Sequence, residues 1–151
     1  MAKQLHTEVE IEATPDRVWA VLTDFAAYHD WNPFIVRAAG QPVLGARLEL
    51  HMRLSGSRTT TIRPEVLEAD PAHRLRWLGR VLLPGLFDGE HTFTLQPAGP
   101  GRTRLTQREE FRGLLAPLVL KLIARSTLAS FHQMNQALKA RAEQPARTPA
   151  R

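Results

Sequence analysis

Residues 114–143 read LLAPLVLKLIARSTLASFHQMNQALKARAE, and this stretch decides the fold. Proline is tolerated only in the first turn of a helix, so Pro117 places a helix start just before it. About 25 residues at about 1.5 Å each predict a rod roughly 40 Å long. Apolar and small side chains recur near a helical period and predict its inward face: Leu115, Leu118, Leu122, Ser126, Ala129, Met134 and Leu138.

The chain before this helix is dominated by strands. Residues 5–11 alternate strictly, with Leu5 and Val9 on one face and Glu8 and Glu10 on the other, which is typical of a half-buried strand. Similar short runs, separated by turn residues, predict further strands, and Pro64 suggests an edge or a bulge within one of them. The predicted strands cover residues 5–11, 35–38, 47–54, 59–67, 74–77, 90–96 and 103–111.

Two short helices are expected after the first strand. Thr14 can cap free amides, Pro15 suits the first helical position and Asp16 complements the helix dipole. A second short helix or turn over residues 25–29 ends before Pro33, because the residue before a proline is pushed out of helical geometry.

This order of elements predicts an α+β fold. A curved seven-stranded antiparallel sheet would wrap around the long C-terminal α-helix, since a helix face and a sheet face must cover each other. One helix cannot fill a strongly bent sheet along its whole length, so a cavity is expected between them. We expect a single ligand-binding domain over residues 1–143 and a disordered basic tail over 144–151.

Composition excludes several classes of protein. The chain has 151 residues, 43% apolar and 23% charged, and no cysteine, which excludes disulfides and thiolate chemistry. No apolar run is long enough for a membrane span, and residues 1–6 turn polar at once, which favours a cytoplasmic protein without a signal peptide. The net charge is +5, but much of the excess lies after Lys139, so we expect no specific nucleic-acid partner.

Several segments together resemble a known family. They are residues 14–19 (TPDRVW), 31–34 (WNPF), 88–95 (DGEHTFTL), 101–106 (GRTRLT) and 110–113 (EFRG), followed by the long helix ending MNQALK at 134–139. Their order is similar to that of the START-related superfamily, also called SRPBCC, and of its bacterial polyketide cyclase/dehydrase-type proteins. The resemblance spans residues 3–143. It implies a helix-grip fold with a deep apolar pocket, in a superfamily that includes lipid carriers, hormone receptors and aromatase/cyclases.

Strand alternation places three polar side chains on the concave face. His91, Gln107 and Glu109 share that face with apolar neighbours, and a buried carboxylate needs a partner such as an imidazole. They would form the polar end of an oily pocket, holding a ligand hydroxyl or carbonyl, or acting as acid and base. Alternatively, a one-residue bulge would turn Glu109 outward and Glu110 inward.

Other residues are candidates for the apolar wall. Tyr28, Trp31, Phe34 and Trp77 could stack on a planar ligand at the pocket mouth or plug the core, and Asn32 could contact a ligand or only organise its turn. The remaining predicted lining residues come from strands and from the long helix: Leu50, Met52, Phe93, Phe111, Leu118 and Leu122.

The sequence leaves three functions open. We expect no metal, because no two histidines stand at ligand spacing, and no cofactor, because no phosphate loop, nucleophile elbow or redox fingerprint is present. The first function is binding or transport of a hydrophobic small molecule such as a lipid, isoprenoid or polyketide. The second is a cyclase/dehydratase-type enzyme using His91 and Glu109, and the third is a protein-partner modulator. Residues 81–87 are a candidate lid, and either a monomer or a homodimer fits.

Overall fold

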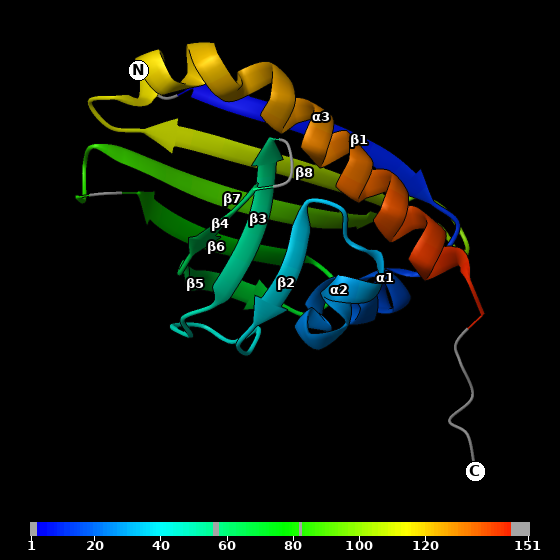
Figure 1. Ribbon diagram of the computed structural model, residues 1–151. Coiled ribbons are helices and arrows are strands. Elements are labelled where there is room, and N and C mark those ends of the chain that lie inside the picture. Colours follow the sequence, from blue (N-terminus) through cyan, green and yellow to red (C-terminus); the bar gives the residue numbers. More distant parts are fainter. Residues whose placement is uncertain (1–2, 56–57, 82, 146–151) are drawn as a thin grey trace.

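The computed structural model describes residues 3–55, 58–81 and 83–145. Over these residues the chain forms two antiparallel sheets and one long helix, with short helices after the first strand (Figure 1). The predicted tail falls mostly on residues 146–151, which lie outside the described residues. The elements are β1 (Lys3–Ile11), α1 (Pro15–Thr23), η1 (Phe25–Ala27), α2 (Tyr28–Trp31), β2 (Ile35–Ala39), β3 (Glu49–Ser55), β4 (Arg58–Ile62), β5 (Glu65–Asp70), β6 (Arg74–Val81), β7 (Phe87–Pro97), β8 (Thr103–Arg112) and α3 (Ala116–Glu143).

The α+β prediction is confirmed, but the strand count differs. In the described residues, β1-β8-β7-β6-β5 form one sheet and β2-β3-β4 a second, giving eight strands instead of seven. The single strand expected over 59–67 is wrong, because β4 ends at Ile62 and β5 begins at Glu65. Pro64 lies between them and has no N–H for a ladder, so the chain changes sheets there. The Leu48 amide donates to the Pro64 carbonyl over 2.8 Å and joins the two sheets.

The hairpin of β6 and β7 is longer than the sequence predicts. β6 runs on to Val81 and β7 begins at Phe87, whereas the predicted strands cover only 74–77 and 90–96. The described part of the turn contacts the start of α3, since the Leu114 and Leu115 amides donate to the Gly85 and Leu86 carbonyls over 3.1 and 2.9 Å. The register from β7 to β8 is unbroken, so the alternative with a bulge at Glu109 is wrong.

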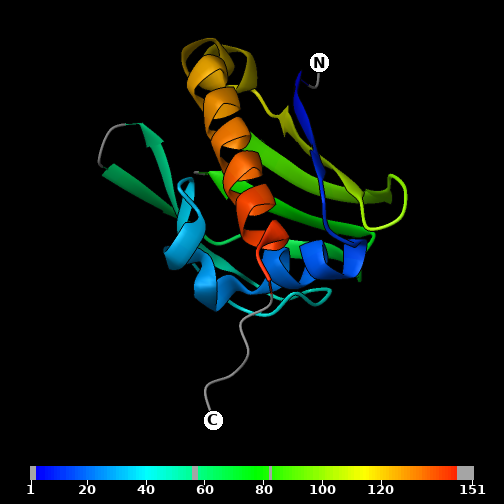
Figure 2. The ribbon, with the colours of Figure 1, turned by 90° about the vertical axis from the view of Figure 1, so that its right-hand side faces the viewer.

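Helix α3 crosses the concave face of the larger sheet, with α1 and α2 at its C-terminal end (Figure 2). Its first two turns are apolar except for the exposed Lys121, and the buried stripe is set by the larger residues that follow. Leu118 and Leu122 are 62% and 79% exposed, so the predicted inward face is out of phase in the first half of the helix, whereas Met134 and Leu138 are buried as predicted. The buried positions are Ala116, Leu120, Thr127, Phe131, Met134, Asn135, Leu138 and Ala142.

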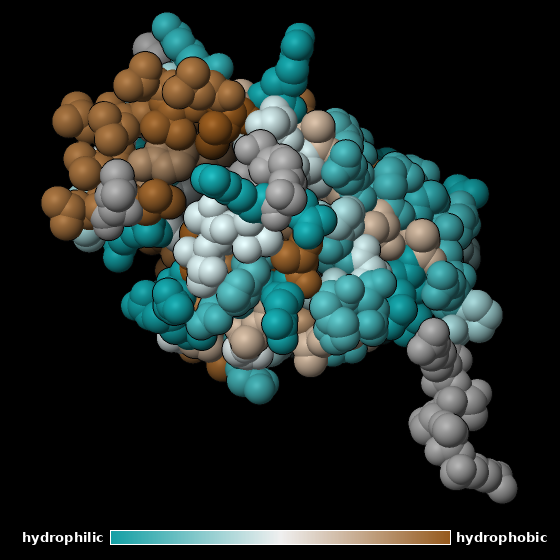
Figure 3. Space-filling model, in the orientation of Figure 1, coloured by the Kyte–Doolittle hydropathy of each residue, from teal (hydrophilic) through white to brown (hydrophobic). Residues whose placement is uncertain are grey.

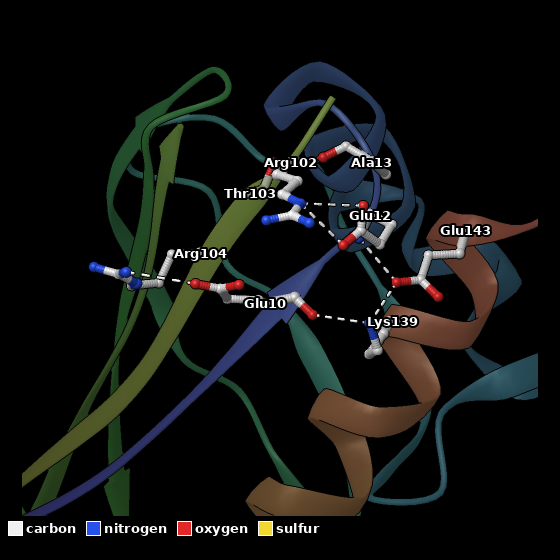
Figure 4. A network of polar contacts seen from close by, with 8 residues as sticks. All are labelled: Glu10, Glu12, Ala13, Arg102, Thr103, Arg104, Lys139 and Glu143. Carbon is white, nitrogen blue, oxygen red and sulfur yellow. Dashed lines mark hydrogen bonds and ion pairs between the residues drawn. The ribbon is translucent and has the colours of Figure 1, made fainter. Parts of the chain in front are cut away.

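The C-terminal end of α3 is bound to the end of β1 by polar contacts (Figure 4). Lys139 Nζ donates to the Glu10 carbonyl over 2.9 Å, and the Glu12 amide donates to Glu143 Oε1 over 2.8 Å. The bond from Lys139 and then the bond from the Glu12 amide hold the pKa of Glu143 below its ordinary value. These contacts anchor one end of the helix, whereas its first half borders the cavity.

Candidate ligand-binding site

A cavity of about 280 Å³ lies between the first half of α3 and the two sheets. Ligand pockets usually hold roughly 300–1,000 Å³, so this cavity suits a compact molecule. Its walls are mostly apolar and draw on β2, β3, β4, β6, β7, β8 and α3. The lining residues are Phe34, Ile35, Met52, Thr60, Ile62, Trp77, Gly79, Val81, Phe87, Gly89, His91, Glu109, Phe111, Leu115, Val119, Ile123 and Thr127.

Two glycines make room for the cavity in the larger sheet. Gly79 on β6 pairs directly with Gly89 on β7, and both line the cavity. A Cβ built on Gly79 would meet only ordinary contacts, the nearest being Ile62 Cδ1 at 3.6 Å. A Cβ on Gly89 would lie 2.6 Å from Glu109 Oε1, so the Glu109 carboxylate occupies the space that a side chain there would need.

His91 and Glu109 form the polar end of the cavity. They are directly opposite in the β7–β8 register, and His91 Nδ1 lies 3.3 Å from Glu109 Oε2. The imidazole stacks on the Trp77 indole, with ring centroids 5.3 Å apart, and meets the Phe131 ring edge-on. The His91 side chain is 2% exposed and that of Glu109 is 14% exposed, so aromatic packing fixes the imidazole beside a carboxylate that reaches the cavity.

A buried chain of hydrogen bonds runs from His91 to β1. His91 Nε2 lies 2.9 Å from Gln107 Oε1, and Gln107 Nε2 donates to Asn135 Oδ1 over 2.7 Å. Asn135 Nδ2 in turn donates to Thr7 Oγ1 over 2.8 Å, and that hydroxyl donates to the Gln107 carbonyl over 3.4 Å. The chain therefore ends on a backbone carbonyl, which can only accept.

The direction of this chain decides which nitrogen of His91 carries a proton. Because the Thr7 hydroxyl gives its proton to a carbonyl, it accepts from Asn135, whose oxygen then faces Gln107. Gln107 must donate to that oxygen, so its own oxygen faces His91 and requires a proton on Nε2. Nδ1 therefore faces Glu109 Oε2, and a hydrogen bond between these two atoms requires a proton on one of them.

Thr127 adds a second polar group to the wall. It lies on α3, lines the cavity and is 3% exposed. Among the described residues, its buried hydroxyl has no hydrogen-bond partner. Nearly all buried polar atoms in proteins are paired, so this hydroxyl is a candidate hydrogen-bonding group for a bound molecule.

The comparisons identify the family. A family profile described as polyketide cyclase / dehydrase and lipid transport matches residues 2–143. The chain belongs to this family. Its membership supports binding of a small molecule, or a polyketide-related role, in general terms. Among curated proteins, no sequence match is found.

Solved structures that are similar to this family member show its fold. The Zhui aromatase/cyclase from Streptomyces sp. R1128 is 20% identical, with a TM-score of 0.74 and coverage of 97% of each chain. A START superfamily protein from Mycobacterium smegmatis is 24% identical, with a TM-score of 0.71 and coverage of 93% of this chain and 97% of that one. Norcoclaurine synthase from Thalictrum flavum is 16% identical, with a TM-score of 0.73 and coverage of 97% and 90%. These similarities show the helix-grip fold.

The cavity of this family member brings together part of the predicted site. His91 and Glu109 reach it, as the strand alternation predicts, and they are accompanied by four of the predicted apolar and aromatic residues. Their placement agrees with the prediction, whereas their contact with a ligand stays a prediction. These residues are Phe34, Met52, Trp77 and Phe111.

Three predicted residues before β2 lie elsewhere. Tyr28 is fully buried, and its hydroxyl donates to the Leu22 carbonyl. Burial, and then the nearby Asp24 carboxylate, raise the pKa of Tyr28 above its ordinary value. Trp31 packs on Tyr28 and lines a separate surface hollow, and Asn32 Oδ1 accepts from the Phe34 and Ile35 amides, both over 2.9 Å. Asn32 thus organises its turn.

Five further predicted residues lie outside the cavity wall. Leu50 and Phe93 are fully buried in the core, and Gln107 lies behind His91 as its hydrogen-bond partner. Leu118 and Leu122 are corrected to the outer face of α3, because Phe131, Met134 and Leu138 set the phase of the helix.

Sequence reasoning missed much of the wall. The facing glycines on β6 and β7 carried a usable signal, since glycine within a strand often marks a close approach or open space. The apolar lining residues on β2, β4, β7 and α3 carried no such signal, because their place in the cavity wall depends on the distance between the two sheets. The missed residues are Ile35, Thr60, Ile62, Gly79, Val81, Phe87, Gly89, Leu115, Val119, Ile123 and Thr127.

Two further searches of the described part of the chain gave negative results. Residues 3–55, 58–81 and 83–145 contain no cluster of three or more His, Asp or Glu side chains placed to hold a metal ion. None of the helices within those ranges is long and apolar enough to cross a membrane.

Proposed function

We propose that this protein binds a compact, largely apolar small molecule in the cavity beneath α3. The apolar walls would hold its body, and the carboxylate of Glu109 and the hydroxyl of Thr127 would hold one polar group. The observation that carries this proposal is the unpaired, buried Thr127 hydroxyl in an otherwise oily cavity wall that Glu109 also reaches.

The shape and chemistry of the cavity narrow the ligand class. Trp77 and Phe34 present aromatic surface, and Glu109 with His91 offers a hydrogen-bonding end that suits a phenol, an alcohol or a carbonyl. A volume of about 280 Å³ favours a small aromatic polyketide-like or short isoprenoid molecule over a long acyl chain enclosed at full length. The binding unit would be the single domain of residues 1–143.

Calorimetric titration with 2-naphthol, a compact apolar probe with one hydroxyl, tests binding. Gly79→Leu places a side chain in the cavity and should weaken binding at least about tenfold, a change of about 1.4 kcal/mol. Gly79→Ala is the matched control, because its methyl group meets only ordinary contacts and leaves most of the cavity open. Equal affinity for the wild type and Gly79→Leu would refute this cavity as the site.

The polar end is tested by comparing 2-naphthol with naphthalene. Thr127→Val removes the hydroxyl and nearly keeps the shape of the side chain, so it should weaken binding of 2-naphthol and leave naphthalene unchanged. Thr60→Val is the control, because Thr60 also lines the cavity but lies on β4, whereas Thr127 lies on α3. Equal losses for both ligands would show that Thr127 only shapes the wall.

A cyclase/dehydratase-type enzyme is the second candidate. The contact of 3.3 Å between His91 Nδ1 and Glu109 Oε2, beside the cavity, favours it, because an imidazole and a carboxyl group so placed could give a proton to a ligand oxygen and take one back. His91→Gln and Glu109→Gln should then abolish turnover of a reactive polyketide-like chain while 2-naphthol still binds. Turnover that survives in both variants would exclude these residues as catalytic groups and leave the binding role.

A further inference from the structure

The first half of α3 and the β6–β7 turn expose large apolar side chains. Leu114, Leu118 and Leu122 are 81%, 62% and 79% exposed, Leu83 is 69% exposed and Val81 is 40% exposed. We name these five residues the apolar rim. Figure 3 shows a hydrophobic corner at the upper left, where Figure 1 has the start of α3 and the β6–β7 turn, beside a largely hydrophilic surface. A large contiguous apolar patch on a protein surface usually marks an interaction site, so this corner needs a partner.

The apolar rim is continuous with the cavity. On α3, Leu115, Val119 and Ile123 line the cavity while Leu118 and Leu122 point outward from the same turns. Val81 belongs to both surfaces, since it lines the cavity and is 40% exposed. The cavity therefore reaches the surface at the apolar rim, and whatever covers this rim also lies against the opening.

The two parts of the apolar rim are held as one unit. The Leu114 and Leu115 amides bind the carbonyls of Gly85 and Leu86, as described above. Gly113 has a φ of +119°, and a Cβ there would lie 2.5 Å from the Leu86 carbonyl oxygen. Because only glycine fits this close approach, the turn and the helix start present their leucines together.

Positive charge borders the apolar rim. Lys121 and Arg125 lie on α3 between and after the exposed leucines, and both are exposed. Among the described residues, neither forms a salt bridge. Glu110 pairs with Arg112 at 2.6 Å and Glu90 with Arg76 at 3.0 Å, and Asp88 accepts from the Gly85 amide of the turn over 3.3 Å. An apolar corner bordered by free cations matches a surface that is apolar inside and anionic outside.

We propose that the apolar rim docks onto an anionic phospholipid bilayer. The leucines enter the boundary between headgroups and acyl chains, and Lys121 and Arg125 bind the lipid phosphates. Docking brings the opening beside Val81 against the bilayer, so that an apolar molecule passes between membrane and cavity without crossing water. This surface role goes beyond ligand binding and does not depend on it.

Vesicle flotation tests the proposal. The wild type should float with vesicles of phosphatidylcholine containing about one quarter phosphatidylglycerol, more weakly with phosphatidylcholine alone, and less as salt rises. The double variant L118S/L122S should lose roughly tenfold or more of its partitioning. The matched control is V43S/L44S, whose residues are 54% and 74% exposed in the segment between β2 and β3 and lie outside the apolar rim.

The charge border has its own matched pair. K121Q/R125Q should lower partitioning onto anionic vesicles several-fold and leave binding to pure phosphatidylcholine unchanged. Arg37→Gln is the control, because Arg37 is an exposed arginine on β2. An equal loss for R37Q would show that net charge, and not this surface, governs binding.

Three results would overturn the proposal. They are no flotation with anionic vesicles, an equal loss for V43S/L44S and L118S/L122S, or a dimer in light scattering that L118S/L122S dissolves while vesicles do not bind. The last result would assign the apolar rim to a second copy of this chain. Gly79→Leu should still float, so a failure of ligand binding and a failure of docking are distinguished.

Discussion

Gln107 on β8 and Asn135 on α3 are joined by a hydrogen bond of 2.7 Å from Nε2 to Oδ1. This bond lies in the middle of a chain that runs from Glu109 at the cavity to the backbone carbonyl behind it. Because each amide must donate on one side and accept on the other, the chain has one direction. Residues of the sheet and of the helix therefore determine together that Nε2 is the ring nitrogen of His91 that donates to Gln107.

The first prediction concerns the His91 ring. Long-range ¹H–¹⁵N spectra should show a proton on His91 Nε2 across the whole pH range in which the protein is folded, since Gln107 Oε1 needs a donor there. A neutral ring protonated only at Nδ1 would contradict the inferred direction.

The second prediction concerns Gly89. Gly89→Ala places a methyl group 2.6 Å from Glu109 Oε1, so the carboxylate must swing away from its present position. Binding of 2-naphthol should weaken by roughly three- to thirtyfold, because a good hydrogen bond is worth about 1 kcal/mol and one to a charged group more. Gly79→Ala, on the paired strand, should bind normally. Unchanged affinity in Gly89→Ala would show that the Glu109 carboxylate does not bind the ligand.

The third prediction tests the corrected phase of α3. Phe131 is fully buried and touches Phe34 and His91, so Phe131→Ala should cost about 3–5 kcal/mol of unfolding free energy. Leu122→Ala, at 79% exposure, should stay within about 0.5 kcal/mol of the wild type. Urea denaturation measures both. A large loss of unfolding free energy in Leu122→Ala would contradict the corrected phase and support the inward position that the sequence predicted.

The fourth prediction is a pH dependence at the end of α3. The pKa of Glu143 is held below its ordinary value of 4.5 by Lys139 and the Glu12 amide, so its contribution is present above that value. It is lost as the pH falls through the lowered pKa of the folded state. Glu143→Gln should therefore lower the Tm at neutral pH, and the difference in Tm between wild type and variant should disappear in acid. Glu8→Gln, on the outer face of β1, is the control and should show no such difference in Tm. A difference for Glu143→Gln that persists in acid would contradict the stabilising role of the ionised Glu143.

Much of the fold could be predicted because local chemistry and global structure agree. Thr14 caps α1 through its hydroxyl, which accepts from the Arg17 amide over 3.2 Å. Strict alternation on β7 and β8 placed His91, Gln107 and Glu109 on the concave face, where the structure has them. In these segments a one-residue shift would expose the core, so the pattern has one solution.

The remainder depended on distances that no local pattern contains. The first turns of α3 are apolar except for Lys121, so Leu118 and Leu122 fit an inward face as well as Leu120 does. Only tertiary packing decides, and it buries Leu120 in a cluster with Phe111 and Ala116. Pro64 signalled an irregularity, but not that the chain would leave one sheet for another. The cavity wall on β4 and β6 depends on the separation of the chain into two sheets, so Ile62 and Gly79 were not predicted as lining residues.

The central claim is that side chains leave room between α3 and the sheets, and crystals exposed to xenon test it most directly. Apolar cavities of about 150 Å³ bind xenon, and this one holds about 280 Å³. We predict strong xenon density above the Gly79–Gly89 pair, between Ile62 and Ile123. Crystals without xenon at this position, with side chains closed over the two glycines, would contradict the account.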